Sequence, residues 1–263
     1  MSEHSNGTAV VTGASSGLGA IYADRLAKRG FDIILVARNR KRLDELAQRL
    51  INETGRSVEV VAADLTDRKD LADVEKILKT GREITLLVNN AGVGAGSPLI
   101  NSDIGDMENM LAINVNALTR LTYAIVPAFL ERGGGTIINV SSIVAVWPEI
   151  LNGVYAGSKA YVMAFSQSLR NELADTNVRI QVVVPGATAT NFWNVAGVDI
   201  NTYPAEAVMQ ARDAVDAALA GLDHGEFVTI PSLPDYSDWK AYEAARQKLI
   251  PNISRRTPAD RYM

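Results

Sequence analysis

Thr8-Ala-Val-Val-Thr12-Gly13-Ala-Ser-Ser-Gly17-Leu-Gly19 decides the fold, because an apolar strand runs through three glycines into a helical segment. Glycine lets the backbone turn tightly and approach an anion, and the N-terminus of the next helix points N–H groups and a positive dipole end at that anion. The spacing Gly-x-x-x-Gly-x-Gly predicts a pyrophosphate cradle in this strand–turn–helix context. The alternative is a simple turn in which glycine is needed only for its backbone conformation.

Short β-branched runs alternate with amphipathic segments along the rest of the chain. Continuous apolar stretches such as 33–36 suit strands buried on both faces, and the intervening segments are long enough for crossover helices. We therefore predict an α/β fold, a doubly wound (Rossmann-type) parallel sheet of about seven strands with helices on both faces. The expected strands are Thr8–Val11, Asp32–Ala37, Val58–Ala62, Thr85–Val88, Thr136–Val140, Arg179–Val184 and Phe227–Ile230. The expected helices are Gly17–Arg29, Arg40–Glu53, Arg68–Thr80, Asp106–Glu131, Val154–Asp175, Ala205–Gly221 and Ser237–Lys248.

A second pattern indicates acid–base chemistry. In a helix beginning at Val154, the i,i+4 spacing puts Tyr155 and Lys159 on one face, and Ser142 ends a predicted strand. An ammonium about 4 Å from a phenolate stabilises it by roughly 4 kcal/mol at an effective dielectric of about 20, so we expect the pKa of Tyr155 to fall by about three units. The Ser142 hydroxyl is expected to hold the substrate oxygen. The alternative is a surface Tyr-x-x-x-Lys pair without chemistry.

These motifs together resemble the short-chain dehydrogenase/reductase family, in its compact single-domain branch. The resemblance covers nearly the whole chain, and its motifs occur in family order: Thr12-Gly13-Ala14-Ser15-Ser16-Gly17-Leu18-Gly19, Asp64, Asn89-Asn90-Ala91-Gly92, Asn114, Ser142, Tyr155-x-x-x-Lys159, and Pro185-Gly186 with Thr190. It implies an oxidoreductase that uses a nicotinamide cofactor. It also implies the catalytic residues Asn114, Ser142, Tyr155 and Lys159, with Asn114 binding a water that links Lys159 to solvent.

The resemblance further implies a set of cofactor-binding residues. Asp64 is expected to contact the adenine, although a helix-capping aspartate is a credible rival on local pattern alone. Asn90 to Gly92 are expected to line the ribose, and Pro185, Gly186, Thr188 and Thr190 to meet the nicotinamide end. The full set is Gly13, Ser15, Ser16, Gly17, Leu18, Gly19, Arg38, Asp64, Leu65, Asn90, Ala91, Gly92, Tyr155, Lys159, Pro185, Gly186, Thr188 and Thr190.

The end of the second predicted strand favours NADP over NAD. A site for the non-phosphorylated cofactor places a carboxylate here for the ribose 2′-hydroxyl, whereas a 2′-phosphate needs cations. Ala37 occupies the acidic position, and Arg38 follows within a positively charged stretch that ends at Arg42. A guanidinium can pair with the phosphate through two donors and stack on the adenine. The alternative is a solvated arginine at a helix start.

Composition limits the remaining possibilities. The 263 residues contain no long Pro-, Gly- or Ser-rich tether, which predicts one NAD(P)-binding domain over 1–263. Zero cysteines exclude disulfides, and two histidines leave little for a metal site, so no metal is expected. The net charge of −4 argues against nucleic-acid binding. Without a signal-peptide pattern or a membrane-length apolar stretch, we expect a cytoplasmic protein.

The substrate is the least readable part. The pocket is expected to be formed by 93–96, 143–152 and 188–204. The last of these segments is expected to belong to a mobile lid around 188–210. These segments carry Trp147, Phe192, Trp193 and Tyr203 but no lysine or arginine, which predicts a small, largely apolar carbonyl or alcohol substrate. One alternative is a 3-oxoacyl-[acyl-carrier-protein] reductase, disfavoured by Gly133 and Thr176 where such reductases tend to carry arginines. Another is a non-catalytic dinucleotide sensor.

The resemblance also bears on assembly. The predicted helices Asp106–Glu131 and Val154–Asp175 pair across two-fold axes in relatives, which implies a homodimer or homotetramer. Their length in this chain permits such pairing.

Overall fold

The computed structural model describes residues 6–263. Seven parallel strands form one sheet in the order β3-β2-β1-β4-β5-β6-β9, and every expected strand lies within it. The α/β prediction is therefore confirmed. The strands are β1 (Thr8–Thr12), β2 (Asp32–Ala37), β3 (Val58–Ala62), β4 (Ile84–Asn89), β5 (Gly135–Val140), β6 (Val178–Val183) and β9 (Val228–Thr229).

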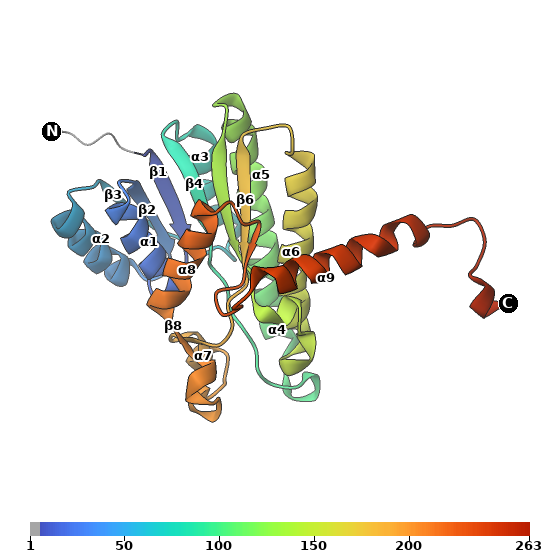
Figure 1. The fold of residues 1–263 in the computed structure, drawn as a ribbon. Helices are drawn as coiled ribbons and strands as arrows, with labels where there is room; N and C mark the ends of the chain where they lie inside the picture. Colours follow the sequence, from blue (N-terminus) through green and yellow to red (C-terminus); the bar gives the residue numbers. More distant parts are fainter. Residues whose placement is uncertain (1–5) are drawn as a thin grey trace. The chain divides into compact units, whose positions relative to one another are not determined.

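Helices cover both faces of this sheet (Figure 1). One apolar core lies between the sheet and α1, α2 and α8, and a second lies between the opposite face and α3, α5 and α6. The buried strands are rich in Val, Ile and Leu because both of their faces are covered. The helices of the larger unit are α1 (Gly17–Lys28), α2 (Arg40–Thr54), α3 (Arg68–Thr80), α4 (Ile104–Leu111), α5 (Leu118–Glu131), α6 (Gly153–Glu172), α7 (Phe192–Val195) and α8 (Ala211–Asp223).

The chain divides into two compact units, Met1–Pro231 and Ser232–Met263. The smaller unit consists of α9 (Tyr236–Leu249) and short 3₁₀ turns, and Trp239 stacks on Tyr242 within it. The expectation of one domain over 1–263 stays a prediction. No described helix is both long and apolar enough to cross a membrane.

Two expected helices differ from the structure. The expected helix Asp106–Glu131 is interrupted by a π-helical segment, Ala112–Ala117, which separates α4 from α5. The expected helix from Ala205 begins only at Ala211, because Met209–Gln210 forms strand β8 and pairs with β7 (Thr188–Ala189). That parallel pair joins the two ends of the expected lid.

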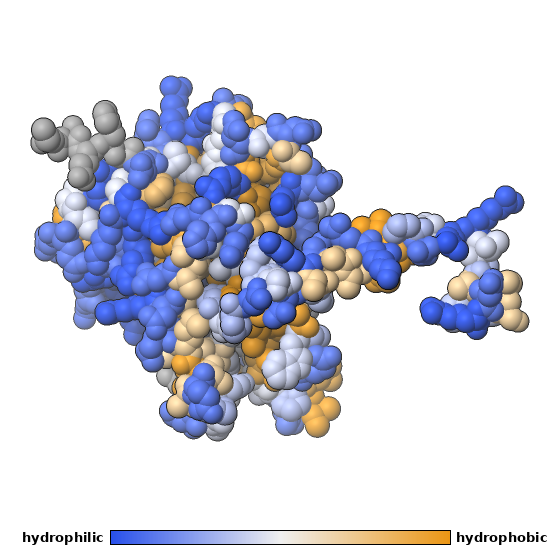
Figure 2. All heavy atoms as spheres, in the orientation of Figure 1, coloured by the Kyte–Doolittle hydropathy of each residue, from blue (hydrophilic) through white to orange (hydrophobic). Residues whose placement is uncertain are grey.

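The order of the strands positions the site. β1 lies between β2 and β4, so the direction of winding reverses there and a crevice opens beyond the carboxyl ends of β1 and β4. In Figure 1, β8 and α7 lie together at the lower end of the larger unit. Figure 2 shows hydrophobic atoms at the surface in this lower region, whereas the upper left of the same face is mostly hydrophilic.

Candidate active site

A cleft of about 410 Å³ opens at the carboxyl ends of the strands. It is lined by every expected cofactor residue except Gly19, and by three expected catalytic residues, Ser142, Tyr155 and Lys159. Gly19 and Asn114 are buried and do not line the cleft. One cavity therefore combines the two motifs that lie more than a hundred residues apart in the sequence.

The glycine-rich turn has the geometry of a phosphate cradle. Gly13 and Gly17 have φ angles of 67° and 55°, a region that favours glycine. Ser16 is the N-cap of α1, and its side chain makes no capping hydrogen bond with any described residue. The first N–H groups of α1 therefore face a cleft that suits an anionic group.

A cross-link behind this turn holds β1 against β4. The hydroxyl of Thr12 donates to the carbonyl of Val88 (3.1 Å) and accepts from the backbone N–H groups of Asn90 and Ala91 (3.0 Å each). The Asn90 amide returns a hydrogen bond to the Thr12 carbonyl (2.9 Å). These bonds fix the two strand ends that flank the crevice. The sequence analysis quoted Thr12 only as part of the motif and missed this role.

The cleft carries positive charge beside the carboxyl end of β2. Arg38 lines it beside Ala37, and Arg42, which the sequence analysis did not single out, lines it too. Arg42 lies in the first turn of α2, where a helical side chain points back toward the N-terminus. The position of Arg42 in the first turn of a predicted helix is the signal that could have placed its side chain in the cleft. Nη1 of Arg38 lies 3.9 Å from Oδ2 of Asp64. Both side chains are exposed, so this ion pair contributes little to stability.

Asp64 is not a helix cap. Its carboxylate accepts from the backbone and the hydroxyl of Thr66, whereas Asp67 caps α3 by accepting from Lys69 and Asp70. The local-pattern alternative for Asp64 is therefore wrong. Asp64 remains available on the cleft wall.

Ser142, Tyr155 and Lys159 are brought together by β5 and α6. Ser142 follows β5 and accepts a hydrogen bond from the N–H of Val144, while Asn152 caps α6 three residues before Tyr155. The Lys159 ammonium donates to the carbonyl of Val140 (3.0 Å). All three catalytic candidates are at most 8 % exposed.

Burial sets the protonation of this group, contrary to our expectation for the tyrosine. Burial raises the pKa of Tyr155 to about 12, and the hydrogen bond with Ser142 opposes that shift without cancelling it. Burial also lowers the pKa of Lys159 to about 8. The expected three-unit fall in the pKa of Tyr155 is therefore wrong, because desolvation of the phenolate dominates. At neutral pH Tyr155 is a phenol and can act as an acid.

Asn114 lies in the π-helical segment, and its amide is almost fully used. Nδ2 donates to the Val93 carbonyl (2.8 Å) and to the hydroxyl of Ser158 (3.0 Å), and Oδ1 accepts from the Val93 N–H (2.9 Å). Irregular π turns within helices frequently occur at functional sites. One lone pair of Oδ1 remains for a further donor, and the relay water stays a prediction.

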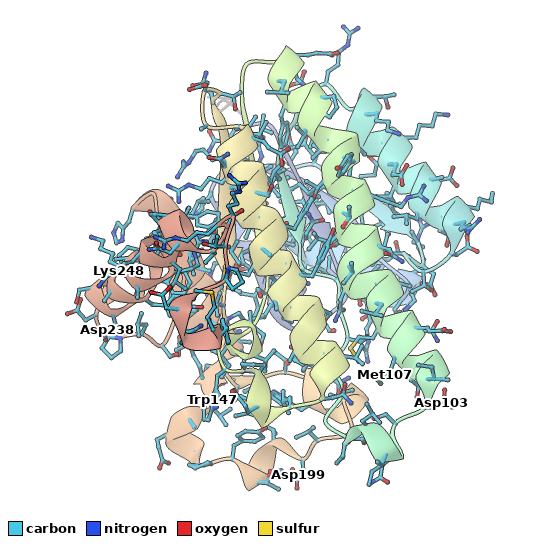
Figure 3. The ribbon with its side chains drawn as sticks, turned by 90° about the vertical axis from the view of Figure 1, so that its right-hand side faces the viewer. Asp103, Met107, Trp147, Asp199, Asp238 and Lys248 are labelled. Carbon is cyan, nitrogen blue, oxygen red and sulfur yellow. The ribbon has the colours of Figure 1, made fainter. Side chains whose placement is uncertain are left out.

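The substrate end of the cleft is apolar. An apolar cluster of Met107, Met110, Val144, Tyr155 and Ala156 packs against Val93, Ala95, Ile150, Leu151, Val154 and Phe192. None of the described residues that line this end carries a charge apart from Lys159. Trp147, expected in the pocket, does not line it and is 57 % exposed. Figure 3 shows Met107, Trp147, Asp103 and Asp199 at the same end of the larger unit.

No group of three His, Asp or Glu side chains within residues 6–263 could hold a metal ion. The glycine turn, the buried Ser-Tyr-Lys set and the apolar end make up the site.

This combination matches a known family. A family model described as short chain dehydrogenase matches residues 7–200. The chain belongs to the short-chain dehydrogenase/reductase family. It is an NAD(P)-dependent oxidoreductase acting on CH–OH and C=O groups, as the resemblance implied.

Solved structures of this family resemble the whole chain. A short-chain dehydrogenase from Sphingobium yanoikuyae in complex with NADPH is 44% identical, covers 97% of this chain and 100% of its own, and has a TM-score of 0.94. A bulky-bulky ketone specific alcohol dehydrogenase from Comamonas testosteroni is 39% identical, covers 99% and 100%, and has a TM-score of 0.91. A curated relative, the very-long-chain 3-oxoacyl-CoA reductase of Anas platyrhynchos, is 35% identical over 72% of this chain, and the match spans only 62% of that protein.

Proposed function

We propose that this enzyme reduces bulky, largely apolar ketones or aldehydes to alcohols with NADPH. The observation that carries the proposal is a single cleft that joins the glycine turn, Arg38, the buried Ser-Tyr-Lys set and an uncharged apolar end. Two similar proteins, a short-chain dehydrogenase in complex with NADPH and a bulky-bulky ketone specific alcohol dehydrogenase, support it. Because no described cation other than Lys159 lines the substrate end, an acidic carrier protein finds no anchor there.

The residues of the cleft fit NADPH. A Cβ on Gly13 would lie 2.9 Å from the Cα of Ala91, so the close approach of these two segments requires glycine. Gly17 and Ser16 would hold the pyrophosphate at the start of α1. Arg38 and Arg42 would meet a 2′-phosphate, and the segment from Pro185 to Thr190 would meet the nicotinamide end. When bound, the nicotinamide supplies the hydride that reduces the carbonyl carbon.

The protein's own groups would handle the proton. Tyr155 keeps its proton at neutral pH and would donate it to the substrate oxygen as that oxygen gains charge. The Ser142 hydroxyl would donate a hydrogen bond to the same oxygen and hold it beside the phenol. Lys159, as an ammonium, would stabilise the phenolate that remains.

Asn114 would act behind these groups by fixing the backbone of Val93 and by holding a relay water. Gly92 keeps the space between them open, since a Cβ there would lie 2.9 Å from Oδ1 of Asn114 and 3.5 Å from Nζ of Lys159. A proton could then reach Lys159 through this gap.

Tyr155→Phe tests the chemical part of the proposal. It should keep the fold and NADPH binding but lower kcat for ketone reduction by roughly 10²–10⁴-fold, because only the acidic hydroxyl is lost. Tyr161→Phe is the matched control on the same helix, since the Tyr161 hydroxyl contacts Thr119 and does not line the cleft. NADPH consumption with a panel of ketones measures both variants. A Tyr155→Phe enzyme with near-wild-type kcat would refute the role of the phenol.

We also propose a homodimer or homotetramer. Leu111, Tyr123 and Leu130 are 40 %, 72 % and 44 % exposed on the α4–α5 segment, which suits a covered helix face. Light scattering at micromolar concentration should give a mass of at least two chains. A stable monomer would contradict this.

A further inference from the structure

Two glycines after β4 make room for side chains of the lid. A Cβ on Gly94 would overlap the tip of the Phe192 ring, and a Cβ on Gly96 would overlap Cγ2 of Val198. Neither glycine has a φ angle that demands glycine, so the need at both positions is for space. The loop 93–96 therefore contains two notches, each filled by one lid residue.

Polar contacts fix the lid in this position. The Gly96 N–H donates to the carbonyl of Ala196 (3.1 Å), and the indole N–H of Trp193 donates to the carbonyl of Thr188 (2.7 Å). The Trp193 ring also packs at 5.4 Å from Tyr203, which lies near the far end of the lid. Since β7 and β8 pair at the two ends, the backbone around Phe192 is held at several points.

Phe192 consequently forms a wall of the cleft beside Tyr155. Its ring centroid lies 5.9 Å from that of Tyr155, and Trp193 abuts it edge-on at 5.6 Å. With Gly94 against its tip and Trp193 beside it, the open side of the ring is the cleft, which Phe192 lines. A ring displaced from the Gly94 notch would have to move into the substrate space.

We infer that Gly94 and Phe192 form a size filter that sets how large a carbonyl substituent this enzyme accepts. The missing Cβ at position 94 lets the ring sit back from Tyr155 and leaves room for a bulky group. This inference rests on the proposed ketone reduction. It predicts that Gly94 affects large ketones and spares small ones, and that it acts only through the Phe192 ring.

Four enzymes test the inference: wild type, Gly94→Ala, Phe192→Ala and the double variant, each with NADPH and with 1,2-diphenylethanone or 2-butanone. Gly94→Ala should lower kcat/KM at least tenfold for the diphenyl ketone and less than twofold for 2-butanone. On the Phe192→Ala background the same change should alter the ratio of the two values less than twofold. Gly153→Ala is the matched control, because no described atom outside its chain neighbours and the nearby backbone of its own helix lies within 4 Å of the added Cβ.

The filter is wrong if Gly94→Ala slows both ketones equally, or if its selectivity persists without the ring. Phe192→Ala alone must raise the ratio of kcat/KM for the diphenyl ketone to kcat/KM for 2-butanone. This variant tests the filter even if the Gly94→Ala protein does not fold. A crystal structure of Gly94→Ala gives a readout without turnover: the Phe192 ring must have left its notch. If the wild type reduces neither ketone, the proposed function is wrong. If the Phe192 ring stays in place in the Gly94→Ala structure, the size filter is wrong, whatever the activity.

Discussion

At both Gly19 and Gly94 an added Cβ would overlap neighbouring atoms, but the kind of neighbour differs. A Cβ on Gly19 would overlap the backbone carbonyl of Gly13 and lie 2.6 Å from the Asn90 amide, whereas a Cβ on Gly94 would meet the tip of one aromatic ring. Backbone inside a turn cannot yield, but a side chain can turn aside. The cofactor side of the cleft is therefore rigidly specified, and the substrate side is adjustable. Changes on the first side should affect every substrate alike, and changes on the second should be selective.

Among the changes that compare the two sides of the cleft, Gly19→Ala should have the largest effect. The added Cβ would push the glycine turn away from Asn90, at a cost of about 3 kcal/mol or roughly a hundredfold in NADPH affinity. Titration of the cofactor by calorimetry measures this, and the loss in kcat/KM should be the same for large and small ketones. A substrate-selective loss would break the comparison with Gly94.

The choice of cofactor should change next, and without regard to the ketone. A charge-assisted contact of Arg38 with the 2′-phosphate is worth about 1.5–3 kcal/mol, so NADPH should be favoured over NADH by roughly ten- to a hundredfold in kcat/KM. Arg38→Ala should mostly erase this preference, and Ala37→Asp should reverse it. Arg40→Ala is the matched control, since Arg40 pairs with Asp44 on the surface of α2. Steady-state kinetics with both cofactors decide. Equal efficiencies in the wild type would show that Arg38 is only solvated.

The pH dependence should follow the burial of Tyr155 and Lys159. Because burial holds the pKa of Lys159 at about 8, the ammonium is lost as pH rises through that value. The phenolate left by proton donation then loses its stabilising charge, so kcat for reduction should fall above pH 8. Alcohol oxidation needs Tyr155 deprotonated, and with its pKa raised to about 12 that rate should climb throughout pH 7–10. A reduction rate that is flat between pH 7 and 10 would contradict the assignment.

The smallest expected effect is a gain in stability. Gly157 lies within α6 and its φ is not left-handed. No described atom outside its chain neighbours and the nearby backbone of α6 lies within 4 Å of an added Cβ. Gly157→Ala should raise the free energy of unfolding by about 0.5–1 kcal/mol, because glycine is a poor helix former. Chemical denaturation measures this. A destabilised Gly157→Ala would show that a glycine with open surroundings can still be required, and would weaken the space argument for Gly94.

Much of the molecule could be predicted from local pattern. The β-branched strands and the glycine turn depend on neighbours a few residues away, and the structure has the expected strands within one or two residues. The π-helical segment could not be predicted, because the i→i+5 pattern around Asn114 accompanies hydrogen bonds to Val93 and Ser158, which are distant in sequence. The late start of α8 has the same origin, since β8 forms only by pairing with β7.

The sequence by itself determined the parallel sheet, the family and the identity of the candidate site residues. Their signals are spacing, side-chain type and backbone freedom, which are properties of short stretches. Only the tertiary structure decided the protonation of Tyr155, the outward position of Trp147 and the notch that Gly94 offers Phe192. Desolvation and steric fit depend on which distant atoms surround a group, and no local pattern encodes those neighbours.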